Sequence, residues 1–334
     1  MKYFTTVNDV HSVKDLVEDA LHFKKDPSCF SNFGKNKTLG LIFLNPSLRT
    51  RLSTQKAAMN LGMNVMVMNL DKEGWALEFE DGAIMNGNKA EHIKDAAAVI
   101  GQYCDIVGIR CFPGLLSRQE DYSEKVLINF MKHCSIPVVS LESATLHPLQ
   151  SLADLMTIQE TWNKPSKPKV VLSWAPHVKA LPQAVANSFS EWMVKSNVDF
   201  TITHPAGYEL NEEYTKGATI TTNQQKGLEG ADYVYVKNWS SYMDYGQINC
   251  RDEAWMLTKE KLRATNQAKI MHCLPVRRNI EISDQLLDGP DSLTLLQASN
   301  RVYAAQAVLK KLIDYRIPEG GNVRVTMGKE KNLS

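Results

Sequence analysis

The chain has 334 residues, of which 43% are hydrophobic and 22% charged, and its formal net charge is +1. Because a single hydrophobic core rarely grows to this length, the sequence predicts two domains of roughly 150 residues each. A charge so near zero excludes a broad nucleic-acid-binding surface, so any recognition of anions has to be local.

The cysteines and the apolar runs indicate the compartment. The six cysteines have neither CxxC spacing nor companion histidines, so the sequence indicates no disulfide scaffold and no metal site. Residues 1–15 lack the apolar core of a signal peptide, and no apolar run reaches the roughly 18 residues of a membrane span. We expect a cytoplasmic protein that needs no cofactor and binds neither a membrane nor nucleic acid.

Short apolar or β-branched runs alternate with amphipathic stretches along the whole chain. This alternation is typical of parallel sheets with helices on both faces, so the sequence predicts an α/β fold of two doubly wound parallel-sheet domains. The predicted strands are 37–44, 64–70, 105–111 and 137–142 in the first half, and 169–175, 198–203, 218–222, 232–236 and 269–274 in the second.

A polar segment over 163–169 contains two prolines, which end the preceding helix, predicted over 148–162, and lead into a new strand. Ligands of doubly wound sheets bind beyond the carboxyl ends of the strands, so the active site is expected in the cleft between the two domains. The end of the chain has little apolar surface to bury. The predicted parts are a first domain over 1–147 completed by a C-terminal helix over 299–316, a second domain over 148–298, and a mobile tail over 317–334.

The segment NPSLRTR, residues 45–51, contains a conflict between charge and helix geometry. Arg49 and Arg51 fall in the first turn of a predicted helix, where the helix dipole disfavours cations. A bound phosphate or carboxylate would resolve the conflict, because free N–H groups, the Ser47 and Thr50 hydroxyls and a guanidinium converge there. The alternative is a solvated arginine pair with Ser47 as an ordinary N-cap.

Three further clusters follow predicted strands. Arg110 ends the third strand, although an arginine there can also extend to the surface. His147 precedes a proline at a helix start, with Gln150 one turn on, and it could equally be a helix cap. Cys273 lies in HCLPVRR, residues 272–278, but no sequence neighbour obviously lowers its pKa, and most buried cysteines are inert. Four such clusters at strand ends favour an anion in the cleft.

Together, SLRTR at 47–51, HPLQ at 147–150 and HCLP at 272–275 resemble the motifs of the aspartate and ornithine carbamoyltransferase family. The motifs occur in the same order and spacing, and the match spans about residues 1–316. The resemblance implies a first domain that binds carbamoyl phosphate, a second that binds the amino acid, and a homotrimer with shared active sites. It also implies acyl transfer without a covalent enzyme intermediate.

The family's catalytic roles fall on matching residues of this chain. Thr50, Arg110 and His147 would polarise the carbonyl oxygen of carbamoyl phosphate. The carbonyls of Cys273 and Leu274 would orient the attacking amine, and the peptide bond after Leu274 would be cis. The residues implied to contact carbamoyl phosphate are Ser47, Leu48, Arg49, Thr50, Trp75, Arg110, His147, Gln150, Cys273, Leu274 and Arg301.

The amino-acid side departs from the ornithine enzymes. Lys237 stands where those enzymes carry an acidic residue for a free α-ammonium, which a lysine would repel by about 1–4 kcal/mol at about 4 Å. If the α-nitrogen is acylated, Lys237 can bind a carboxylate instead. This pattern resembles the acylornithine enzymes of the family, in which Trp75 and residues 85–92 come from the neighbouring subunit. The residues implied at the acylornithine are Glu142, His177, Lys237, Arg278 and Ala90.

Position 90 bears on the identity of the acyl group. The acetyl type of enzyme typically has a glutamate there, whereas Ala90 would not repel a succinyl carboxylate, which Arg278 could then pair. We therefore expect carbamoyl transfer to the δ-amine of N-succinyl-L-ornithine, giving N-succinyl-L-citrulline and phosphate in arginine biosynthesis. N-acetyl-L-ornithine is the alternative substrate. A non-catalytic anion-binding protein is the alternative outside the enzymes.

Overall fold

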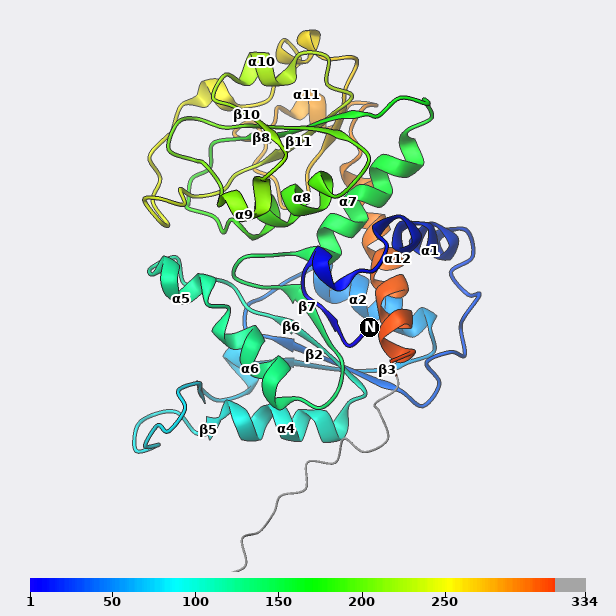
Figure 1. The fold of residues 1–334 in the computed structure, drawn as a ribbon, viewed down its shortest axis with the longest axis vertical. Coiled ribbons are helices and arrows are strands. Elements are labelled where there is room, and N and C mark those ends of the chain that lie inside the picture. The colour runs from blue at the N-terminus through cyan, green and yellow to red at the C-terminus, as the bar shows by residue number, and fades with distance from the viewer. Residues whose placement is uncertain (316–334) are drawn as a thin grey trace, which may run out of the picture.

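All nine predicted strands are present in the computed structural model, which describes residues 1–315 (Figure 1). Together with the short strand β1, which was not predicted, they form two five-stranded sheets whose neighbouring strands are parallel, one in each lobe of the molecule. The first sheet has the order β1 (Tyr3–Phe4), β7 (Val138–Glu142), β6 (Ile106–Arg110), β2 (Thr38–Phe43) and β3 (Asn64–Asn69).

The second sheet repeats this design with residues from the second half of the chain. Its inner strands are buried along nearly their whole length, as their continuous apolar runs require. The order is β10 (Thr219–Thr221), β9 (Asp199–Thr203), β8 (Lys169–Trp174), β11 (Tyr233–Lys237) and β12 (Lys269–Met271).

Each sheet has one point where the strand order reverses. The chain leaves β2 for β3 on one side and later returns to β6 on the other, and β8 lies in the same way between β9 and β11. Such reversal points open a crevice beyond the carboxyl ends of the strands. The residues that follow β2, β6, β8 and β11 can therefore meet in space.

The helices agree with the prediction in their main features. The helix expected over 148–162 spans 148–161, and the last helix starts at Thr294 rather than 299. The segment 163–168 is a connection without helix or strand. The predicted tail over 317–334 lies outside the described residues. The helices are α1 (Val13–Lys25), α2 (Arg49–Asn60), α3 (Leu70–Glu73), α4 (Ile93–Tyr103), α5 (Arg118–Tyr122), α6 (Lys125–His133), α7 (Pro148–Thr161), α8 (Ala184–Val194), α9 (Glu212–Thr215), α10 (Gln224–Leu228), α11 (Asp284–Leu287) and α12 (Thr294–Ile313).

Two of these helices join the lobes. α7 runs from the first sheet to the second, and its residues 148–158 are all buried because both lobes pack around it. α12 returns from the second lobe and packs against α1, α2 and α7, as the predicted crossing helix should (Figure 1). One hydrophobic cluster consequently extends from Phe4 in the first lobe to Trp239 in the second.

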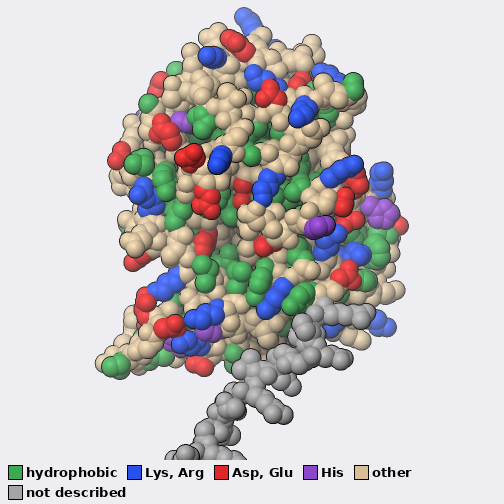
Figure 2. Space-filling model, viewed as in Figure 1, with side chains coloured by type: hydrophobic (Ala, Val, Ile, Leu, Met, Phe, Trp, Pro, Cys, Tyr) green, Lys and Arg blue, Asp and Glu red, His purple; other side chains and the backbone are tan. Residues whose placement is uncertain are grey.

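The surface carries charges of both signs. On the face shown in Figure 2, lysine and arginine side chains are interspersed with aspartate and glutamate. None of the helices in the described part of the chain is long and apolar enough to cross a membrane.

Candidate active site

A cavity of about 460 Å³ lies between the two sheets, beside the place in each sheet where the strand order reverses. Within residues 1–315, five cationic side chains line it and Glu142 is the only carboxylate among the lining residues. It gathers twelve of the sixteen residues predicted from the sequence. These are Ser47, Arg49, Thr50, Arg110, Glu142, His147, Gln150, His177, Lys237, Cys273, Leu274 and Arg301.

The start of α2 supplies the first part of the cavity wall. Its first turn contains no acidic residue. Ser47 Oγ accepts a hydrogen bond from Thr50 N at 3.3 Å. Arg49 is half-buried and has no hydrogen-bond partner within residues 1–315, and burial lowers its pKa. Arg51 lies outside the cavity and donates to Asn69 Oδ1 at 3.4 Å, so the two arginines have different environments.

Arg110 is buried rather than extended to the surface. Its Nη1 donates to Glu142 Oε2 at 2.5 Å and to Thr50 Oγ1 at 3.4 Å. The guanidinium also lies 4.4 Å from the centroid of the Phe112 ring. His147 Nε2 is 3.5 Å from the same oxygen of Glu142. One carboxylate therefore holds both the guanidinium and the imidazole in place.

Arg301 reaches the cavity from α12. Its Nη2 donates to Thr50 Oγ1 at 2.6 Å, and its Nη1 donates to Gln150 Oε1. Nε of Arg110, Nε of Arg301 and Nδ1 of His147 are buried and have no hydrogen-bond partner in the described residues. Because buried polar atoms are normally hydrogen-bonded, these atoms indicate that the site is built for a polar ligand.

Burial sets the protonation states in this cavity. Burial, together with the charges of Arg301 and Arg110, lowers the pKa of His147 well below its ordinary value, so the imidazole is neutral. Burial also lowers the pKa of Arg301 to about 10, which keeps the guanidinium charged at neutral pH. Burial raises the pKa of Cys273, so this residue is a protonated thiol and a poor nucleophile.

The segment after β12 is held by a buried histidine. Leu274 has a φ of +56°, and its following peptide bond is cis, as the resemblance implied. Its N–H donates to His272 Nδ1 at 2.9 Å, so His272 Nε2 carries the hydrogen and donates to Glu281 Oε1 at 3.3 Å. Glu281 Oε2 accepts from Arg277 N at 2.8 Å. These bonds fix Cys273 and Leu274 at the cavity wall.

The second sheet contributes a rim of the cavity whose polar side chains make few hydrogen bonds or ion pairs. Lys237 ends β11 and is buried, and its ammonium has no hydrogen bond or ion pair within residues 1–315. His177 Nε2 accepts from Arg277 Nε at 3.2 Å. Burial lowers the pKa of His177, which favours the neutral form that can accept this bond. Within residues 1–315, neither Lys237 nor Arg277 has a carboxylate that pairs with its side-chain charge.

The structure corrects one predicted residue. Arg278 does not line the cavity, because its guanidinium pairs with Asp284 at 2.9 Å and Asp288 at 2.8 Å on the protein surface. Its neighbour Arg277 lines the cavity instead. The two arginines lie in a loop, where the sequence has no periodic pattern that predicts which side chain projects into the cavity. Sequence reasoning also missed the apolar part of the wall, which carries no motif: Phe112, Leu181, Pro182, Val185 and Val276.

Three more predicted residues, Leu48, Trp75 and Ala90, do not line the cavity of the single chain. Trp75 and Ala90 lie together beside a two-stranded ribbon of β4 (Leu77–Glu78) and β5 (Glu91–His92), a feature too short to be predicted. Ala90 N donates to Ala76 O at 3.1 Å, and Trp75 Nε1 donates to Glu91 Oε2 at 2.8 Å. The Trp75 side chain is 59% exposed.

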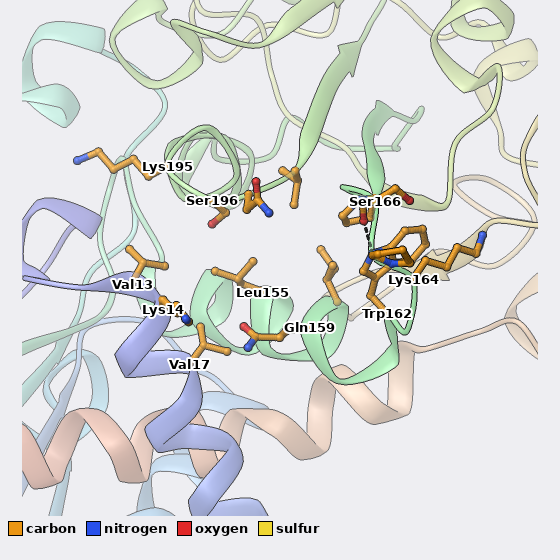
Figure 3. Close-up of a pocket in the computed structure, with 15 residues that line it drawn as sticks. Val13, Lys14, Val17, Leu155, Gln159, Trp162, Lys164, Ser166, Lys195 and Ser196 are labelled. Atoms are coloured by element: carbon orange, nitrogen blue, oxygen red, sulfur yellow. Dashed lines mark hydrogen bonds between the residues drawn. The ribbon is translucent and has the colours of Figure 1, made fainter.

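A second hollow of about 550 Å³ lies between α1, the end of α7 and the loop before β8 (Figure 3). Its wall includes Val17, Leu155 and Trp162, whose Nε1 donates to Ser166 O at 2.7 Å. None of the predicted site residues lines it. The smaller, charged cavity is therefore the candidate active site.

Family models match most of the chain. Residues 2–160 match the aspartate/ornithine carbamoyltransferase carbamoyl-P binding domain, and residues 182–312 match the Asp/Orn binding domain. The chain belongs to the aspartate/ornithine carbamoyltransferase family. The resemblance inferred from three short motifs is thus confirmed.

Similar members of the carbamoyltransferase family include enzymes named for two different acyl groups. The chain is 49% identical to an N-succinylornithine carbamoyltransferase of Bacteroides thetaiotaomicron, over 94% of this chain and 99% of the relative. It is 33% identical to an N-acetylornithine carbamoyltransferase of Xanthomonas campestris pv. campestris, over 85% of this chain and 89% of that relative.

Solved carbamoyltransferase structures share the two-domain fold. An acetylornithine transcarbamylase complexed with acetylcitrulline has a TM-score of 0.89 at 30% identity, over 93% of this chain and 99% of that chain. A mutant N-acetyl-L-ornithine transcarbamylase, with one glutamate replaced by alanine and complexed with carbamyl phosphate and N-succinyl-L-norvaline, has a TM-score of 0.88 at 31% identity. That match covers 93% of this chain and 100% of the other.

Proposed function

We propose that the chain transfers the carbamoyl group of carbamoyl phosphate to the δ-amine of N-succinyl-L-ornithine, giving N-succinyl-L-citrulline and phosphate in arginine biosynthesis. The observation that carries the proposal is the charge of the cavity, where five cations face one carboxylate in a chain of net charge +1. Buried charges are unfavourable without counter-ions. Carbamoyl phosphate and a succinylated amino acid together supply a phosphate and two carboxylates.

The phosphate is proposed to bind at the start of α2. Arg49 lines the cavity without a partner in the described residues, and the first-turn N–H groups of a helix lack carbonyl partners. Ser47 and the backbone of Leu48 complete this anion site, and Arg301 closes it from α12. The phosphate would then neutralise the positive charges of Arg49 and Arg301, whose pKa values are lowered by burial.

The carbonyl oxygen is proposed to lie between Thr50, Arg110 and His147. Thr50 Oγ1 accepts from both Arg301 and Arg110, so its own hydrogen is free to donate to the substrate. As the amine attacks, negative charge develops on the carbonyl oxygen, and each donor there stabilises the transition state by about 3 kcal/mol. Phosphate then leaves and can accept the amine's proton, because no side chain in the cavity is an obvious base.

Gln150 and the segment after β12 orient the reacting groups in this proposal. Gln150 would accept a hydrogen bond from the carbamoyl amide. The carbonyls of Cys273 and Leu274 would accept from that amide and from the attacking amine, since both residues line the cavity. Only a small fraction of a lysine-like amine, with a pKa of about 10.4, is neutral at pH 7. Holding that fraction in position is therefore the main task of this wall.

The second rim suits an acylated amino acid. Lys237 is buried without a partner in the described residues, which suits an α-carboxylate but not an α-ammonium. Arg277, rather than the predicted Arg278, can pair with the succinyl carboxylate. Glu142 from the first domain and His177 from the second line the same cavity and would also touch the acylornithine.

The succinyl group is favoured over acetyl by the relatives and by Ala90. Identity is 49% with the succinyl enzyme and 33% with the acetyl enzyme. N-acetyl-L-ornithine transcarbamylases with one glutamate replaced by alanine, proline, serine or valine are complexed with N-succinyl-L-norvaline. The resemblance places the glutamate of the acetyl type at position 90. A small residue there leaves room for the longer, charged acyl group.

A homotrimer with shared active sites is part of the proposal. Trp75 and Ala90 are exposed and do not line the cavity of their own chain, so they could reach that of a neighbour. Large apolar side chains on α2 and β3 are exposed in the single chain, which is unusual unless a partner covers them. These side chains are Leu52, Met59, Met66 and Met68.

A cytoplasmic location follows from the same proposal. The six cysteines of the chain are all free. Free cysteines are typical of a reducing compartment, where biosynthetic enzymes act.

The proposal is tested by measuring carbamoyl transfer to ornithine, N-acetylornithine and N-succinylornithine in parallel. We expect the highest kcat/KM with N-succinylornithine. A preference for N-acetylornithine would retain the reaction and change the acyl group, whereas a preference for free ornithine would contradict the role of Lys237. Binding of carbamoyl phosphate without turnover on any amine would support the non-catalytic alternative.

A further inference from the structure

Asp154 is a buried carboxyl group beneath the cavity that the proposed reaction does not use. It lies on α7, one turn after Gln150, and is 0% exposed. Its Oδ1 accepts hydrogen bonds from Gln150 Nε2 and from Gln297 Nε2, each at 2.8 Å. Two amide groups from two helices therefore converge on one oxygen of this side chain.

Asp154 and Arg301 together determine which way the Gln150 amide points. An ionised carboxylate can only accept hydrogen bonds, so it requires the NH2 end of each glutamine. With its Nε2 committed to Asp154, Gln150 turns Oε1 toward Arg301 and the cavity wall. Without Asp154, Arg301 alone would hold the Gln150 amide, and the amide could turn about that single bond.

Gln297 extends the same arrangement to the second domain. Its Oε1 accepts from His272 N at 2.8 Å, at the start of the segment that carries Cys273 and Leu274. Gln297 is 0% exposed, so water does not compete for these bonds. Asp154 therefore connects the wall at Gln150 with the wall after β12.

We propose that Asp154 is a positioning residue, which fixes the Gln150 amide so that its carbonyl oxygen accepts a hydrogen bond from the NH2 group of carbamoyl phosphate. Through Gln297 it also holds the backbone of His272. The inference rests on the proposed function, since it names the ligand group that Gln150 meets. It predicts that Asp154 controls discrimination between carbamoyl phosphate and a ligand of the same shape without that NH2 group.

The hydrogen bonds that Asp154 accepts from Gln150 and Gln297 can persist when its carboxyl group is protonated. Burial raises the pKa of this carboxyl to about 7, with Gln297, Gln150, Tyr235 and Arg301 around it. Its Oδ2 has no hydrogen-bond partner within residues 1–315, whereas Oδ1 has two donors. A proton would therefore reside on Oδ2 and leave Oδ1 as the acceptor.

The test compares binding of carbamoyl phosphate and acetyl phosphate, in which a methyl group replaces the NH2 group. The wild type should prefer carbamoyl phosphate. Asp154→Leu should lower this preference by about tenfold, because a hydrogen bond of ordinary strength is lost from one ligand only. Asp154→Asn keeps an acceptor oxygen and should retain the preference within about twofold. A purely structural role would weaken both ligands equally.

Thr157→Val is the matched control, because Thr157 is another buried polar residue of α7 that does not line the cavity. It should leave the preference unchanged. If thermal unfolding shows that Asp154→Leu is not folded, Asp154→Ser gives the same comparison with a smaller side chain. An unchanged preference in a folded Leu or Ser variant overturns the inference, as does a tenfold loss in Asp154→Asn. A wild type that binds neither phosphate contradicts the proposed function instead.

Discussion

The two rims of the cavity are built in different ways. On the first-domain rim, Arg110 and His147 each lie within hydrogen-bonding or ion-pairing distance of Glu142, and Arg301 donates to Thr50. On the second-domain rim, Lys237 is buried without a partner in the described residues, and within residues 1–315 the guanidinium of Arg277 donates only to the neutral His177. The first rim is assembled before any substrate arrives, whereas the second depends on its ligand for charge balance.

This difference shows that removing a cation from the cavity can either destabilise the fold or leave its stability nearly unchanged, depending on whether the cation has a partner. A cation that already has a carboxylate partner cannot be removed without leaving that partner unpaired. A cation without a partner can be removed at little cost or even with a gain in stability, because it is retained for the ligand. Arg49 and Arg301 are the exceptions on the first rim, since neither has a carboxylate partner within residues 1–315.

Arg49→Ala should produce the largest effect on binding. Charged hydrogen bonds to the phosphate are lost, so we expect carbamoyl phosphate affinity to fall by about 100-fold or more. The melting temperature of the unliganded protein should stay the same or rise slightly, because a cation leaves the first turn of α2. Calorimetric binding and thermal unfolding measure both quantities. Unaltered binding would mean that the dipole argument is misapplied to this helix.

Lys237→Met tests the second rim in the same way. The variant keeps the length of the side chain and removes its charge, so kcat/KM for the acylornithine should fall by about 30-fold. Carbamoyl phosphate affinity should remain within about twofold of wild type, since Lys237 belongs to the other rim. Equal losses for both substrates would show that the rims are not independent.

Ala90→Glu addresses the ribbon that carries Trp75. A glutamate should repel the succinyl carboxylate, so the ratio of kcat/KM for N-succinylornithine to that for N-acetylornithine should fall by about tenfold. Ala90→Gln is the control of nearly the same size without the charge. If selectivity does not change in Ala90→Glu, position 90 plays no part in choosing the acyl group.

Arg278→Ala should have the smallest effect. Its exposed pairs with Asp284 and Asp288 lie outside the cavity, so kcat/KM should change by less than about twofold. Arg277→Ala is the adjacent control and should lower kcat/KM for N-succinylornithine by about tenfold, because Arg277 lines the cavity. The reverse order of effects would restore the original sequence-based choice of Arg278.

The sequence predicted the fold well because strands buried in parallel sheets carry continuous apolar runs. The strand over 105–111 and the one over 232–236, for example, correspond to β6 and β11 within one or two residues at each end. The two-residue strands β1, β4 and β5 were missed, since no pattern can be read from so short a segment. The start of α12 was placed five residues late.

The motifs led to most of the cavity wall but not to its internal connections. Arg110 could equally have reached the surface, and only burial against Glu142 and Phe112 removes that alternative. Asp154 gave no signal of its own. A carboxylate within a mostly apolar helix becomes informative only when its partners, Gln150 and Gln297, are seen to converge on it.

The sequence by itself determined the succession of strands and helices along the chain, the family and most of the polar residues that line the cavity. These features depend on apolar periodicity and on motifs that are contiguous in the chain. The tertiary structure decided which side chains face inward, as with Arg277 rather than Arg278, and which charges have partners. Those outcomes depend on side-chain contacts, many of them between segments far apart in the chain, such as Gln150 with Arg301, which no local pattern encodes.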